Sequence, residues 1–227
     1  MRRLLLLIFF CVVSDIPAHA QVGALQTDCR LGNTGGNAGY QFVVTCAGRA
    51  TSPNRRFAVV QHAYRDKQPP IEVQDNRGRV IARLRSVSDD MPFSVHWAPN
   101  SRWFFVNHHV GSFMDVLQVF EIVDRKVIER PALGRSAIKI AAARYPCLNP
   151  DMILPNGARW SRDSGRIALV TISRPDACTT FRRRPGTWQP LWMIGDARTG
   201  LVNPASIRPD THDDGLRMPR NGLYARF

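Results

Sequence analysis

The stretch "WAPNSRWFFV", residues 97–106, decides the predicted fold. It runs from a bulky residue, through a small-Pro-Asn turn, into an apolar run of the kind that forms a β-strand. Proline presets φ in such a turn, and asparagine accepts hydrogen bonds from the backbone that follows it. We therefore expect a tight turn and then a buried strand at this point.

The same pattern occurs twice more, as "TSPNRRFAVV" at residues 51–60 and "WSRDSGRIAL" at residues 160–169. Each copy is followed by an alternating strand that runs into a hairpin turn, at residues 71–78, 117–124 and 191–200. One unit is thus predicted to be four short strands. The units lie near residues 42–85, 88–130 and 157–207.

These motifs resemble the repeats of TolB-like β-propellers, the periplasmic relatives of WD-type propellers. The signature of that family is W-S-P-D-G-x-x-[IL]-A-[FV], followed by an I-x-[VM]-x-D strand and a glycine turn. The copies at 97–106 and 160–169 carry it best, whereas Thr51 replaces the tryptophan in the first copy. The resemblance covers residues 42–205 and implies an all-β, β-propeller-like array of about three to four four-stranded blades. It also implies a protein partner in the cell envelope.

Three units are fewer than the four to eight blades that usually close a propeller. A fourth blade could come from the leading segment, residues 21–50, together with the tail, residues 202–227. Otherwise the array stays open, or two chains complete one ring as a homodimer. The tail ends in the alternating "GLYARF", which favours a closing strand that pairs with a blade, and one short helix is expected at residues 136–145.

The first 20 residues have the layout of a cleaved secretory signal peptide. Arg2 and Arg3 precede an apolar run at residues 4–13, and Ala18-His19-Ala20 forms a small-x-small cleavage site. That run is shorter than the roughly 20 residues needed to span a bilayer. We expect residues 21–227 to form one periplasmic or secreted domain with no transmembrane segment.

Removing the signal peptide leaves 29 basic and 17 acidic residues, a net charge of +12. The densest basic patch is the insertion that holds Arg174 and Arg182-Arg183-Arg184, interleaved with Phe181 and Trp188. Guanidinium groups suit phosphate or carboxylate, and aromatic rings suit a flat sugar. The patch predicts binding of an anionic polysaccharide or glycolipid, with a solvated loop as the alternative.

Four cysteines remain in the mature chain, and an even number in an oxidising compartment predicts two disulfides. Of the three connectivities, Cys29–Cys46 and Cys147–Cys178 are favoured, because each closes a modest loop within one structural unit. Four unpaired buried thiols are the alternative.

The adjacent His108 and His109 are the natural candidates for a metal site, but neighbours in a strand point to opposite faces. The chain has no H-E-x-x-H and no C-x-x-C motif, and we predict no cofactor. His109 with Asp115 is a candidate acid–base pair, and Ser112 lies between them. A binding module is therefore the leading hypothesis. A hydrolase or lyase acting on an acidic envelope polymer is the competing one.

Overall fold

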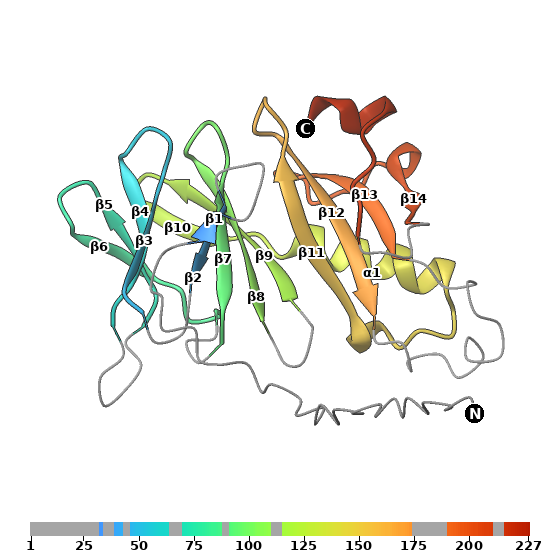
Figure 1. Cartoon of the computed structure of the whole chain (residues 1–227), viewed down its shortest axis with the longest axis horizontal. Helices are drawn as coiled ribbons and strands as arrows, with labels where there is room; N and C mark the ends of the chain where they lie inside the picture. Colours follow the sequence, from blue (N-terminus) through green and yellow to red (C-terminus); the bar gives the residue numbers. More distant parts are fainter. Residues whose placement is uncertain are drawn as a thin grey trace, which may run out of the picture.

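The computed structural model describes residues 32–33, 39–42, 46–63, 70–87, 91–109, 115–173, 190–210 and 216–227. Within these residues the strands form three antiparallel sheets side by side, with one α-helix against the third (Figure 1). The predicted mostly-β architecture with one helix is confirmed. The described strands form no closed ring of blades, so the propeller itself stays a prediction.

The first sheet consists of two hairpins, as predicted for the first unit. Its strands, in spatial order, are β3 (Gly48–Thr51), β4 (Phe57–Gln61), β5 (Glu72–Asp75) and β6 (Val80–Arg83). The β5–β6 turn closes on Gly78, whose φ of +75° lies in the left-handed region that glycine adopts without a Cβ clash.

The second sheet contains the second predicted unit and two further strands. The unit comprises β7 (Phe93–Trp97), β8 (Trp103–His109), β9 (Asp115–Val123) and β10 (Lys126–Glu129). The short strands β1 (Gly32–Asn33) and β2 (Gly39–Phe42) extend the sheet beyond β7. For these residues, the hypothesis that the leading segment builds a separate fourth blade is therefore wrong.

The third sheet contains β11 (Ile153–Trp160), β12 (Arg166–Ser173), β13 (Leu191–Asp196) and β14 (Arg208–Pro209). Short 3₁₀ turns precede β11 and β14: η1 (Pro150–Met152) and η2 (Pro204–Ser206).

The tail ends in a 3₁₀ turn, η3 (Gly222–Arg226), so the expected closing strand is wrong for these residues. The cause lies in Tyr224, which is buried and donates its hydroxyl hydrogen to the Ser206 carbonyl at 2.8 Å. Holding that side chain against the face of the third sheet requires a compact turn rather than an extended edge.

The helix α1 (Ala132–Arg144) begins before the predicted start at residue 136 and ends just before Tyr145-Pro146. The residue before a proline is disfavoured in the α region, which explains the end. Leu133, Ala137 and Ala141, spaced four apart, form its buried face. Among the described residues, no helix combines the length and apolarity needed to cross a membrane.

The three motif turns adopt the same conformation, which explains the repeat in physical terms. In each turn one backbone N–H bonds a carbonyl five residues later: Ser52 to Phe57, Ala98 to Trp103 and Ser161 to Arg166. The residue three positions after each donor is left-handed, with φ of 60° at Arg55, 60° at Ser101 and 63° at Ser164.

The tryptophan of the motif joins one sheet to the sheet before it. The Trp97 indole N–H donates to the Ala50 carbonyl at 3.0 Å, and the Trp160 indole to the His96 carbonyl at 2.8 Å. Thr51 holds this position in the first unit, and among the described residues no sheet precedes β3 for an indole to reach. This accounts for the departure of the first copy from the motif.

Within the described residues, three apolar clusters pack against the sheets. One lies between the first and second sheets and includes Val59, Val73 and Phe104. Another joins the second and third sheets to α1 through Phe105, Leu133 and Leu169. The last lies where the tail covers the other face of the third sheet, and contains Ala168, Val170, Trp192, Ile194 and Tyr224.

Candidate functional site

The two adjacent histidines lie on opposite faces of β8. His108 is buried and stands across the sheet from Phe93 and Val116, whereas His109 is half-buried and stands across from Asp115. The pair therefore cannot bind one ion from the same face. Among the described residues, no group of three His, Cys, Asp or Glu side chains is arranged to hold a metal.

His109 and Asp115, the candidate acid–base pair, lie within hydrogen-bonding distance of each other. The His109 Nδ1–H donates to Asp115 Oδ1 at 3.0 Å, and the Asn156 side-chain amide donates to Asp115 Oδ2 at 3.1 Å. Because a carboxylate only accepts, this bond places the proton on Nδ1 and leaves Nε2 as the basic ring nitrogen. The cluster also links the second sheet to the third, since Asn156 belongs to β11.

Several predicted residues lie outside the described part of the chain. They are Ser112, the proposed ligand-binding set Arg174, Phe181, Arg182, Arg183, Arg184 and Trp188, and the cysteines Cys29 and Cys178. Cys46 and Cys147 are disulfide-bonded cysteines, but the favoured pairing with Cys29 and Cys178 stays a prediction.

An acidic residue occupies the same register position in all three sheets. Asp75 pairs with Phe57, Glu121 with Trp103, and Asp196 with Arg166, and these three partners are equivalent residues of the motif turns. These three acids are not among the site residues predicted from the sequence. The acidic residue near the end of each alternating strand was the signal that could have revealed them.

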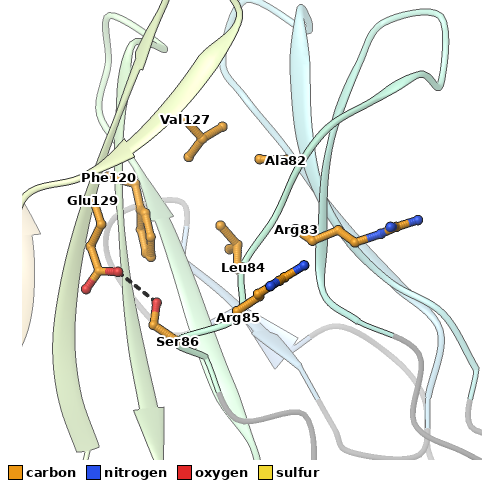
Figure 2. Close-up of a pocket in the computed structure, with 8 residues that line it drawn as sticks. All are labelled: Ala82, Arg83, Leu84, Arg85, Ser86, Phe120, Val127 and Glu129. Carbon is orange, nitrogen blue, oxygen red and sulfur yellow. Dashed lines mark hydrogen bonds between the residues drawn. The ribbon is translucent and has the colours of Figure 1, made fainter.

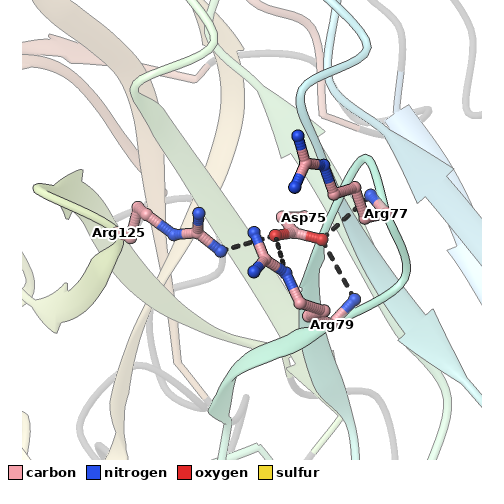
Figure 3. Close-up of polar contacts among 4 residues, drawn as sticks. All are labelled: Asp75, Arg77, Arg79 and Arg125. Carbon is pink, nitrogen blue, oxygen red and sulfur yellow. Dashed lines mark hydrogen bonds and ion pairs between the residues drawn. The ribbon is translucent and has the colours of Figure 1, made fainter.

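Asp75 is the most heavily bonded of the three acids (Figure 3). Its Oδ1 accepts the backbone N–H groups of Arg77 and Arg79, and its Oδ2 accepts the side chains of Arg79 and Arg125. Burial raises the pKa of this carboxyl, but the hydrogen bonds and the Arg79 charge outweigh it and lower the pKa to about 2. Since Arg125 comes from the β9–β10 turn, Asp75 also connects the first sheet to the second.

Glu121 holds a second pair of arginines in the same way. Its Oε1 pairs with Arg102 Nη2 at 2.6 Å, and its Oε2 with Arg130 Nη2 at 2.7 Å. The carboxylate is buried, while the two arginine side chains remain 50% and 42% exposed. Asp75 and Glu121 thus fix the position of guanidinium groups that still reach solvent.

Comparison with protein-family models and with curated proteins finds no match.

A shallow groove of about 260 Å³ opens between β6 and β10 (Figure 2). Its apolar floor consists of Leu84, Phe120 and Val127. Arg85 lies on the segment that follows β6, and from the same segment the Ser86 hydroxyl donates to Glu129, at the end of β10, at 2.9 Å. This is a place where the core between the first and second sheets reaches the surface.

Proposed function

We propose that this protein is an exported binding module of the cell envelope, built as a TolB-like β-propeller array and dedicated to contact with a protein partner. The observation that supports the proposal is that the same motif turn occurs in all three sheets, and that the tryptophan before it in the second and third sheets hydrogen-bonds to the preceding sheet. These contacts hold three similar sheets in one scaffold. In such scaffolds the surface loops and grooves carry the function, while the sheets position them.

On this proposal, the partner inserts an extended segment with apolar and acidic side chains into the groove between β6 and β10. The floor of Leu84, Phe120 and Val127 would take the apolar anchors. Arg85 is exposed and forms no ion pair within the described residues, so a partner carboxylate would complement it. β6 is short and has a register shift in its pairing with β5, which favours side-chain contacts over addition of a strand.

Photo-crosslinking tests this contact directly. A benzoyl-phenylalanine at Ala82, inside the groove, is expected to give one discrete protein adduct in cells, and Arg85→Glu is expected to reduce it several-fold. The matched control carries the crosslinker at Lys139, which is exposed on α1. Identical adducts from both positions, no adduct at Ala82, or a yield unaffected by Arg85→Glu would each overturn the proposal.

The second candidate function is hydrolysis or elimination on an acidic envelope polymer. It is favoured by the His109–Asp115 bond, because a carboxylate on Nδ1 orients the imidazole and leaves Nε2 to accept a proton.

This candidate predicts cleavage of an acidic polysaccharide such as alginate, pectate or heparin by the purified chain. His109→Asn should then lower the rate about 100-fold or more. Asp124→Asn, which removes an exposed turn acid, should leave it unchanged. A parent protein that cleaves none of these polymers, or a fully active His109→Asn variant, rules the candidate out.

A further inference from the structure

The hairpin turns of the three sheets form one continuous edge, here named the turn edge. It comprises residues 52–56, 76–79, 98–102, 124–125, 161–165 and 197–200. The backbone N–H of Asn54 donates to the Ser101 hydroxyl at 3.0 Å, and the backbone N–H of Asn100 to the Ser164 hydroxyl at 2.9 Å. The three motif turns, seen along the top of Figure 1, are thereby hydrogen-bonded in a row.

The turn edge is rich in exposed arginine. It carries Arg55, Arg56, Arg77, Arg79, Arg102, Arg125, Arg162 and Arg198. Within the described residues, Arg55, Arg77 and Arg162 have neither an ion pair nor a side-chain hydrogen bond. All three sheets contribute, so the positive charge extends along the whole edge rather than around one pocket.

Most of the acids among these hairpins are bonded within them. Asp163 Oδ1 accepts the Ser161 hydroxyl and the Gly165 amide, which with the Arg166 side chain lower its pKa to about 2. Asp196 Oδ1 accepts the Thr199 backbone amide at 2.7 Å. Asp75 and Glu121 are buried beneath arginines, whereas Asp124 and Asp163 are exposed acids of the edge.

Part of the guanidinium array is already oriented. Asp75 holds Arg79 and Arg125, whose side chains remain 55% and 53% exposed. A guanidinium has five N–H donors, and these pairs occupy only some of them, so the rest are available to an incoming anion. Holding the side chains in place beforehand lowers the entropy lost on binding.

We propose that the turn edge binds a linear anionic polysaccharide through its carboxylate, sulfate or phosphate groups. A row of arginines on three sheets fits a polymer better than a single small anion. Among the described residues, the aromatic rings that directly follow the motif turns offer no open platform, since Phe57 lies under Arg56 and Trp103 is buried. Single-stranded nucleic acid, which needs rings for base stacking, is therefore a poorer fit.

This site differs from the basic insertion around Arg182 and from the groove between β6 and β10. The turn edge would bind an anionic ligand in addition to the protein partner proposed for the groove. The two proposals can be refuted separately, because the crosslinking test does not involve the turn edge.

The test uses the mature full chain and heparin as the probe. The edge variant combines Arg55→Glu, Arg77→Glu and Arg162→Glu. A matched variant combines Arg135→Glu, Lys139→Glu and Arg220→Glu, which are exposed positions outside the six segments of the turn edge and give the same change in charge. A third variant changes Arg182, Arg183 and Arg184 to glutamate. Circular dichroism and thermal unfolding confirm that each variant is folded.

The edge variant is expected to bind heparin at least about tenfold more weakly, and the slope of log affinity against log salt should fall by about 3, one for each arginine. The matched variant should stay within about threefold of the parent. Equal losses in the edge and matched variants, no loss in the edge variant, or a loss confined to the third variant overturns the proposal. Binding of duplex DNA as tightly as heparin overturns the assignment to polysaccharide.

Discussion

At the scale of single residues, Asp75 shows how a buried acid can organise a basic surface. Its carboxylate takes four hydrogen bonds from three arginines of two sheets (Figure 3). The pKa of about 2, lowered from 3.8, means that the deprotonated Asp75 carboxylate stabilises the folded state. The stabilisation is present above pH 4 and is lost as the pH falls from about 4 to about 2.

Asp75→Asn is therefore expected to be less stable than the parent at pH 7, and the difference should shrink as the pH approaches 2. The difference shrinks because protonation at low pH removes the carboxylate charge of Asp75 from the parent, and the substitution has already removed that charge from the variant. Urea unfolding at a series of pH values measures it. Asp124→Asn, which removes one exposed acid from the turn edge, should stay within about 0.5 kcal/mol of the parent at pH 7. A difference for Asp75→Asn that does not depend on pH would contradict this account.

At the scale of elements, one indole hydrogen bond contributes to each joint between neighbouring sheets. Trp160 is buried, and its indole N–H donates to the His96 carbonyl. The ring therefore contributes apolar packing, and the N–H contributes a hydrogen bond to the same joint. Asn107 makes a second joint, since its side chain bonds both the N–H and the C=O of Gly157. A side chain at Gly157 would collide with Phe105, because an added Cβ would lie 2.8 Å from that ring.

Trp160→Phe should lower the free energy of unfolding by about 1–3 kcal/mol, because it leaves a buried carbonyl without its donor. Trp97→Phe should behave alike, since it removes the bond to Ala50. Trp103→Phe is the matched control: Trp103 is equally buried, but its indole makes no hydrogen bond within the described residues. A cost for Trp103→Phe as large as for Trp160→Phe would assign the effect to ring volume instead.

At the scale of the whole molecule, the two ends of the array differ. The outward face of the first sheet is polar, where Arg49 donates to Gln74 and Gln74 to Glu72. The outward face of the third sheet is apolar, and the tail covers it with Tyr224 and Phe227. The tail thus occupies the face on which a following sheet would otherwise stack.

Removing residues 216–227 is expected to cause self-association, because it uncovers Val170, Trp192 and Ile194. Light scattering after size-exclusion chromatography measures this, with the full mature chain expected to be a monomer. The homodimeric ring, which the sequence left open as one alternative, requires instead that the full mature chain be a dimer. A concentration-independent dimer of the full chain would support that ring, and a truncated chain that stays monomeric would contradict the capping role of the tail.

Local sequence was sufficient to predict the turns and the strands that follow them. A small-Pro-Asn turn before an apolar run directs the same backbone wherever it occurs, so the three four-stranded units follow from residues 51–60, 97–106 and 160–169. The opposite orientation of His108 and His109 follows from strand alternation, whereas the register of β8 against β9 in the structure sets Asp115 opposite His109.

Only the tertiary structure decided which units touch and what their contacts create. The pairing of β2 with β7, the seating of Tyr224 on the third sheet and the gathering of arginines around Asp75 all join residues distant in the chain. Such contacts depend on how sheets stack, which no local pattern encodes. The sequence by itself therefore determines the turns, because their conformation depends on a few neighbouring residues. The packing of the sheets determines the turn edge and the groove, because both are made by residues from different sheets.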